Sequence, residues 1–116
     1  MNIGFKNNKI KKLCTKPTSV KKEYTIELSK KLYMRLDSLR AALTLSDIPP
    51  ISPDRCHDLK GDLKGFFAVD LEGRYRLIIK PVDKNGNSWN LKKYNINYIK
   101  NNTVNIIICE ISKHYE

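Results

Sequence analysis

The sequence has few cysteines, few histidines and no long hydrophobic run. Its three cysteines, Cys14, Cys56 and Cys109, are odd in number and include no CxxC pair. This pattern argues against a disulfide framework and a zinc ribbon, so we expect reduced thiols in a cytoplasmic protein. The two histidines lack the helical Glu/His spacing of a zinc site. We therefore expect no metal and no other cofactor.

The sequence also lacks a segment that could span a membrane. The chain has no apolar run of the roughly 18 residues that a spanning helix needs. Residues 1–13 mix lysines with isolated apolar side chains and lack the continuous hydrophobic centre of a secretory signal. We therefore expect no membrane partner.

Acidic residues are outnumbered by basic ones. The chain has 12 Asp and Glu against 22 Lys and Arg, a net charge of +10, and residues 1–40 alone hold 11 basic and 3 acidic side chains. Such a field favours nucleic acid, an anionic membrane or an acidic protein as partner. The sequence is also rich in Asn and Ile, so a genome-wide composition bias is an alternative source of part of the charge.

The length of 116 residues suits one domain, which we place at residues 1–116. A short strand is expected at residues 2–6, followed by a brief helix that Pro17 stops. Leucines then recur at spacings of four, four, three and four, which places them on one face of a helix. They are Leu28, Leu32, Leu36, Leu39 and Leu43. We expect this helix to continue through residues 41–45 and to end at Pro49-Pro50.

The second half of the chain alternates with the period of strands. Phe67, Val69 and Leu71 predict one strand, and Glu72-Gly73 predicts a tight turn. Residues 74–80 predict the next strand, closed by Pro81. On it Tyr75, Leu77 and Ile79 share one face, whereas Arg74, Arg76, Ile78 and Lys80 share the other. Three cations on one face of a strand are the first indication of an anion site.

Residues 83–103 form an Asn-rich connection that we expect to be a long loop or an insertion with its own short helix. Trp89 within it is a candidate anchor for a protein partner or a stacked base, with packing of the insertion as the alternative. Residues 104–111 are apolar on both faces, as in a central strand. The order predicts an α+β fold with N-terminal helices packed on one small, mainly antiparallel sheet.

The densest polar stretch, residues 55–62, contains His57 and Lys60. If the strands pair as a meander, His57, Arg76 and His114 can converge on one face. Attack of an RNA 2′-hydroxyl on its own phosphate needs a base, an acid and positive charge on the phosphorane, and these residue types supply all three without a metal. A surface or capping role for His57 is the alternative. Cys56 as a nucleophile is disfavoured because neighbours on a strand face opposite ways.

The ordered series Arg55-Cys56-His57-Asp58-Leu59-Lys60-Gly61-Asp62 and Val69-Asp70-Leu71-Glu72-Gly73-Arg74-Tyr75-Arg76-Leu77-Ile78 resembles the HigB-like killer toxins of the RelE/ParE superfamily. Phe5, Lys9, Lys12, Leu13 and Cys14 match the same group, as does the helix segment at residues 35–42. The resemblance covers most of the chain except the 83–103 connection.

The resemblance implies a RelE-like fold and ribosome-dependent cleavage of messenger RNA, neutralised by a small HigA-like antitoxin. His57, Lys60 and Arg76 fall on the family's catalytic positions. Arg76 would neutralise the scissile phosphate, and His57 and Lys60 would share acid–base and electrostatic work. The chain departs from the family at its C-terminus, where His114 and Tyr115 stand in exchanged order, so the catalytic position there falls to one or the other.

Two alternatives share the fold. One is a ParE-like toxin that inhibits DNA gyrase without cleaving RNA; the other is a catalytically impaired RNA-binding relative. The presence of His57, Lys60 and Arg76 together favours the nuclease. For contacts with RNA or the ribosome we expect the basic side chains of the strand face and of the first helix, namely Arg74, Lys80, Lys9, Lys11 and Lys12.

Overall fold

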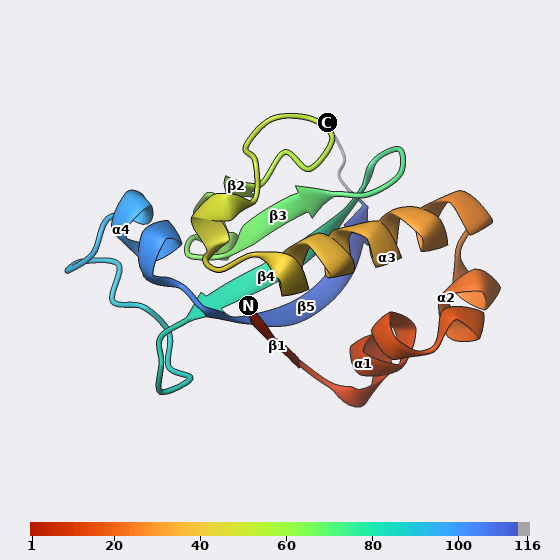
Figure 1. Cartoon of the computed structure of the whole chain (residues 1–116), viewed down its shortest axis with the longest axis horizontal. Helices are drawn as coiled ribbons and strands as arrows, with labels where there is room; N and C mark the ends of the chain where they lie inside the picture. The colour runs from red at the N-terminus through yellow and green to blue at the C-terminus, as the bar shows by residue number, and fades with distance from the viewer. Residues whose placement is uncertain (114–116) are drawn as a thin grey trace.

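The computed structural model describes residues 1–113. A five-stranded sheet has the strand order β1-β5-β4-β3-β2, and helices α1, α2 and α3 lie on one of its faces (Figure 1). The strands are β1 (Asn2–Phe5), β2 (His57–Asp58), β3 (Phe67–Asp70), β4 (Tyr75–Val82) and β5 (Asn105–Lys113). The helices are α1 (Asn8–Thr15), α2 (Pro17–Glu23), α3 (Ile26–Ala41) and α4 (Ile96–Asn102). β1 pairs parallel with β5, and the other pairs are antiparallel. The expected α+β class is confirmed.

Helix α3 carries the predicted leucine stripe. Thr25 caps its N-terminus, where the hydroxyl accepts a hydrogen bond from the backbone N–H of Leu28. The first four leucines are each at most 1% exposed, so this face forms the centre of the core against the sheet. Truncating one such leucine to alanine typically costs about 2–5 kcal/mol of stability.

The predicted end of this helix is wrong. The helix stops at Ala41, and Leu43, expected in the stripe, is 81% exposed. The chain turns because Ala42 has an extended backbone and the Asp47 carboxylate accepts the backbone N–H groups of Leu43 and Thr44. These bonds begin a short 3-10 turn at Leu45–Asp47, which buries Leu45 in place of Leu43.

The starts of the two N-terminal helices are also set by single local residues. The Asn7 side chain caps α1 by accepting the N–H of Ile10, and Ile10 and Leu13 face the core. Pro17 ends that helix as expected, but it also begins a second one. A proline in the first turn of a helix loses no intrahelical hydrogen bond, so α2 starts there.

Pro81 does not close β4, contrary to the prediction. The strand continues to Val82, and Pro81 pairs with Ile106 of β5. The pairing of β3 with β4 ends at Ile79, so beyond that residue β4 has an edge on the β3 side. A proline is tolerated at such an edge because its missing N–H breaks no ladder bond.

The two faces of the sheet differ in character. Leu77 and Ile79 of β4 join the core under the helices, together with Phe67 and Val69 of β3. The other face, here called the open face, has only a small apolar cluster built on Leu59, Ala68, Ile78 and Cys109. The predicted alternation of β4 is therefore confirmed.

Between β4 and β5 the chain forms a turn, an irregular stretch and α4. The Asp83 carboxylate accepts the backbone N–H groups of Asn85 and Asn87 and so holds the turn. Trp89 donates its indole N–H to the hydroxyl of Thr103, which is fully buried. Across residues 1–113, no helix has the length and apolar character needed to cross a bilayer.

Candidate functional site

Strand pairing brings two of the predicted catalytic residues to the open face. His57 lies opposite Ala68, which lies opposite Ile78. Two residues further along, Asp70 of β3 lies opposite Arg76 of β4. Directly opposed residues of antiparallel strands project to the same side, so His57 and Arg76 share the open face.

Arg76 has an unsatisfied donor at this site. Its side chain is half-buried, and its Nε is buried with no hydrogen-bond partner within residues 1–113. A buried unpaired donor of a charged group is costly, so a ligand that supplies an acceptor would be favoured at this position. A phosphate oxygen is an acceptor that matches the guanidinium fork.

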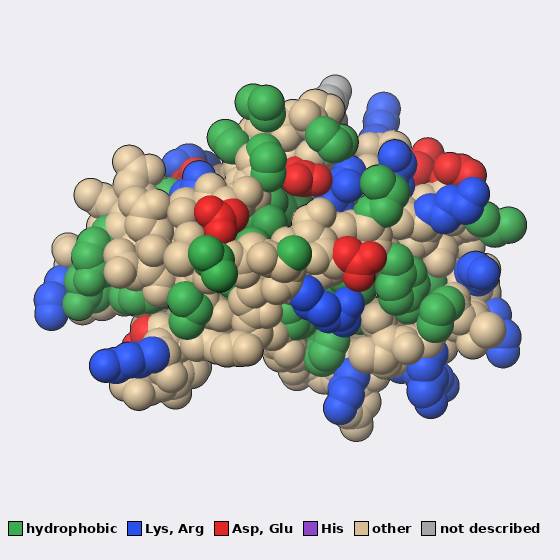
Figure 2. All heavy atoms as spheres, viewed as in Figure 1, with side chains coloured by type: hydrophobic (Ala, Val, Ile, Leu, Met, Phe, Trp, Pro, Cys, Tyr) green, Lys and Arg blue, Asp and Glu red, His purple; other side chains and the backbone are tan. Residues whose placement is uncertain are grey.

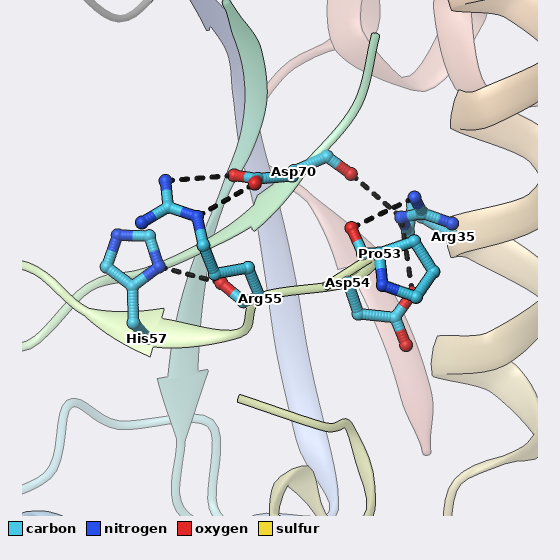
Figure 3. Close-up of polar contacts among 6 residues, drawn as sticks. All are labelled: Arg35, Pro53, Asp54, Arg55, His57 and Asp70. Carbon is cyan, nitrogen blue, oxygen red and sulfur yellow. Dashed lines mark hydrogen bonds and ion pairs between the residues drawn. The ribbon is translucent and has the colours of Figure 1, made fainter. Parts of the chain in front are cut away.

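The carboxylate opposite Arg76 is already bound. Asp70 accepts two hydrogen bonds from Arg55, from Nε at 2.8 Å and from the second guanidinium nitrogen at 3.1 Å (Figure 3). This bidentate bond raises the pKa of the Arg55 guanidinium. Arg55 thus neutralises the acid that would otherwise pair with Arg76.

Arg55 also orients His57. The carbonyl oxygen of Arg55 lies 2.7 Å from Nδ1 of His57 (Figure 3). A carbonyl can only accept, so Nδ1 carries the proton and Nε2 is the nitrogen left for proton exchange with a substrate. Arg55 adopts a φ of 43°, in the left-handed region that non-glycine residues seldom occupy. Such backbone strain clusters at functional sites.

A buried arginine on α3 anchors this loop. Arg35 is 4% exposed, and its Nε donates to the carbonyl of Asp70 at 2.8 Å. A second guanidinium nitrogen donates to the carbonyl of Pro53 at 3.2 Å, and the Asp54 carboxylate lies 3.3 Å from Nε (Figure 3). Arg35 therefore ties α3 to β3 and to the loop that precedes β2. That loop carries Arg55, whose carbonyl orients His57.

Lys60 pairs with Asp58 and not with His57. It follows β2, and its Nζ donates to the Asp58 carboxylate at 2.8 Å with 85% of its side chain exposed. That bond holds the pKa of Asp58 below its usual range. Asp58 lies opposite Phe67, so it projects to the face opposite to His57. The chain bends directly after Lys60, at Gly61, where a φ of 62° starts a 3-10 turn.

His114 and Tyr115 lie outside the described residues. Ser112 of β5 is directly opposite Arg76, and Lys113 is opposite Tyr75. The last described residues of β5 therefore run beside Arg76.

The predicted RNA contacts fall in three places. Lys80 is on the open face, with Nζ 5.8 Å from the ring centroid of Phe66. Arg74 is exposed in the turn just before β4. Lys9, Lys11 and Lys12 are exposed on α1. Basic side chains gather over α1 and α2 at the lower right of Figure 2.

A basic hollow lies between these two helices. Lys9 and Lys12 line it together with Lys16 and Lys22, and its volume is about 290 Å³. Glu23 is the one acid among its described lining residues, so the hollow keeps an excess of positive charge that attracts a phosphate backbone.

Arg55, Asp70 and Arg35 were not predicted as site residues. For Asp70 the signal was present, because the alternation of β3 puts it on the same face as Ala68, away from Phe67 and Val69. Arg35 also gave a signal, since it falls seven residues after Leu28 on the leucine face, where a charge needs a partner. The role of Arg55 depends on a left-handed backbone that no local pattern predicts.

Within residues 1–113 no three His, Cys, Asp or Glu side chains gather as a metal-binding group. The cysteines of this region are all free and buried.

Comparison with known proteins supports the fold and not a close relationship. No protein-family model matches the chain, and no curated protein is similar to it in sequence. Among solved structures, a YoeB/ParE toxin from Agrobacterium tumefaciens superposes with a TM-score of 0.58 at 10% sequence identity. The match covers 99% of this chain and 100% of that one. The chain therefore has a RelE/ParE/YoeB-like toxin fold, as expected.

Proposed function

We propose that this protein is the toxin of a type II toxin–antitoxin module and cleaves messenger RNA on the ribosome. The observation that carries the proposal is the open face, where His57 and the unsatisfied Arg76 lie together on neighbouring strands. The similarity in fold to a YoeB/ParE toxin supports the toxin class.

The proposed reaction is transfer of the phosphate to the neighbouring 2′-oxygen. A base removes the 2′-hydroxyl proton, and the oxygen attacks phosphorus. The bond to the 5′-oxygen breaks, and an acid returns a proton to that oxygen. The products are a 2′,3′-cyclic phosphate and a 5′-hydroxyl. Arg76 stabilises the charge that develops on the phosphorane oxygens.

His57 takes part in proton exchange through Nε2, because Nδ1 is committed to the Arg55 carbonyl. Lys60 acts with it once its ammonium leaves Asp58 for the substrate, which its exposure permits. His114 or Tyr115 supplies the remaining group from the chain that follows β5. None of these steps requires a metal ion.

The partners follow from the same proposal. The protein is cytoplasmic, and Lys9, Lys11 and Lys12 on α1, with Arg74 and Lys80 near the site, contact ribosomal or messenger RNA. A HigA-like antitoxin covers part of this basic surface. The resemblance to HigB-like toxins belongs to this proposal too.

The test compares wild type with Arg76→Ala in a bacterial translation extract, with messenger RNA ends mapped by primer extension. New ends at ribosome-occupied codons with wild type only are expected, and the variant should lose about 10²–10³ in rate. Arg76→Lys, which keeps the charge and loses the fork, should be intermediate. Intact RNA with every protein would contradict the nuclease, and inhibition of DNA gyrase by wild type would then favour the ParE-like alternative.

A further inference from the structure

We propose that the connection between β4 and β5 holds a second RNA subsite, in which one unpaired nucleobase stacks on Tyr98. This inference rests on the proposed function for its ligand, single-stranded RNA, and adds a place on the protein that the cleavage chemistry does not need.

Three aromatic rings gather in this connection. Tyr94 and Tyr98 are stacked, with ring centroids 4.6 Å apart and an angle of 11° between planes. Trp89 meets both rings edge-on, at 5.4 Å and 6.1 Å. The indole N–H donates a hydrogen bond to the Thr103 hydroxyl, which holds the ring in place. Trp89 therefore packs the insertion, which is one of the roles predicted for it. Tyr98 is 45% exposed, which leaves part of its ring to solvent.

These rings border a hollow of about 630 Å³. Asn85, Asn90 and Asn102 also line it. Asn90 Oδ1 accepts two backbone N–H groups and Asn102 Nδ2 donates to the Tyr98 carbonyl. The Asn90 Nδ2, the Asn102 Oδ1 and the Asn85 amide can match the donor and acceptor edges of a nucleobase. Lys84 and Lys93 supply positive charge at its walls.

The charge of the hollow favours an anionic ligand. Lys93 Nζ lies 5.2 Å from the Tyr94 ring centroid, so a cation and the aromatic stack are presented together. Among the described lining residues the one acid is Asp83, whose Oδ1 accepts two backbone N–H groups. Aromatic rings flanked by cations and amides are the combination with which proteins bind unpaired bases.

Shared lining residues connect this hollow to β4, the strand that carries Arg76 of the candidate cleavage site. Arg76 and Lys80 share the open face of β4 and are four residues, or about 13 Å, apart along the strand. Lys80 and Phe66 line a smaller hollow of about 150 Å³ that Ser88 and Trp89 also line. The same Ser88 and Trp89 border the larger hollow. An RNA strand with a phosphate at Arg76 can therefore follow β4 past Lys80 and place a base a few nucleotides away on Tyr98.

The test uses the one tryptophan in the sequence as its reporter. A single-stranded oligouridylate of about ten nucleotides, 2′-O-methylated to prevent cleavage, is titrated into the full-length protein without ribosomes. Saturable quenching of Trp89 fluorescence is expected. Tyr98→Leu should weaken the affinity at least about fivefold by loss of one stacked base, whereas Tyr98→Phe should retain it.

Two ligand controls separate base stacking from charge. An abasic oligonucleotide of the same length, and polyglutamate as an acidic-protein mimic, should leave the fluorescence unchanged. Equal quenching by either ligand would overturn the subsite, and in the case of polyglutamate would favour a protein partner. RNA binding detected by anisotropy but unaffected in Tyr98→Leu would overturn it as well.

The outcome is independent of the cleavage assay. Arg76→Ala removes cleavage under the proposed function and should leave the quenching of Trp89 in place, although affinity falls. Quenching without RNA cleavage would contradict the nuclease and support the RNA-binding subsite. Cleavage without quenching would support the nuclease and contradict the subsite.

Discussion

Asp70 of β3 lies directly opposite Arg76 of β4, yet its carboxylate is bound by Arg55, which precedes β2. This arrangement separates an opposite-charge pair that strand register would otherwise favour. Among residues 1–113 it leaves Nε of Arg76 without a hydrogen-bond partner. The availability of Arg76 therefore depends on Arg55.

Arg55→Ala should slow cleavage although it leaves every proposed catalytic side chain in place. With its bidentate partner gone, Asp70 is free to pair with Arg76 and to compete with the substrate phosphate. We expect cleavage in the translation extract to fall by at least about tenfold. The double variant Arg55→Ala/Asp70→Asn should recover most of the activity because the competing charge is gone, and Asp70→Asn alone should stay close to wild type. Failure of the double variant to recover would refute this role for Asp70.

Arg35→Ala should destabilise the fold. The substitution leaves the Asp54 carboxylate without its partner and removes the donor to the partly buried carbonyl groups of Asp70 and Pro53. Removing one partner of a buried ion pair typically costs about 3–5 kcal/mol, measured here by urea unfolding. Arg40→Ala is the matched control on the same helix, since its pair with Asp37 is exposed and should contribute less than about 1 kcal/mol. Equal losses for both variants would contradict the anchoring role of Arg35.

Lys60→Ala should raise the pKa of Asp58 towards its ordinary range. The hydrogen bond from Lys60 lowers this pKa in the folded protein, so the pair stabilises the fold above the unfolded-state pKa of Asp58. That contribution is lost as the pH falls through the lowered, folded-state value. The difference in stability between wild type and variant should therefore be present at neutral pH and vanish in acid. Titration of the Asp58 carboxyl carbon by NMR measures the shift directly; an unchanged curve would show that the pair does not form in solution.

The cysteines should be unreactive in the folded protein. Burial raises the pKa of Cys14 and of Cys56 to about 11, and each is 1% exposed. Thiolate is the reactive form, so neither residue should be alkylated by iodoacetamide at neutral pH until urea unfolds the chain. Mass spectrometry of the alkylated protein distinguishes the two states. Rapid modification of Cys56 in the folded state would contradict this prediction and make Cys56 a candidate nucleophile again.

Binding to ribosomes should weaken steeply with salt. Each phosphate contact releases counterions, so the logarithm of the affinity falls linearly with the logarithm of salt concentration. Lys9→Gln/Lys12→Gln removes two ammonium groups from the hollow between α1 and α2 and should reduce that slope by about one to two. Lys30→Gln/Lys31→Gln on α3 serves as the charge-matched control. Co-sedimentation over a salt series gives the slopes, and identical slopes for the two double variants would argue against this contact surface.

Local periodicity was sufficient to predict much of the fold. The leucine spacing identified α3, and the alternation in β4 assigned Leu77 and Ile79 to the core and Arg76 to the other face. These properties depend on repeats of two or about four residues, which the sequence carries directly. The end of α3 was missed because the Asp47 side chain turns the chain at Leu43, and the length of β4 was missed because the edge at Pro81 depends on where β3 ends.

The site was predictable only in part. His57 and Arg76 share a face because β2, β3 and β4 are neighbours, a relation that the order of segments suggested. Lys60 pairs with Asp58, a contact two residues away that depends on the chain leaving β2 at once. The position of Arg55 required knowledge of its left-handed backbone and of the register that brings Asp70 within reach.

The position of β5 has a consequence for synthesis. This strand is the last element of the described chain, yet it lies between β1 and β4 and pairs with both. A nascent chain without β5 has no neighbour for β1 and no Ser112 beside Arg76, so the sheet closes only after residue 113 has emerged. Long-range pairing of this kind is slow to form, so we expect the five-stranded sheet to be completed only once β5 is available. If the protein attacks translating ribosomes as proposed, a nascent chain that lacks β5 would not yet carry the complete sheet.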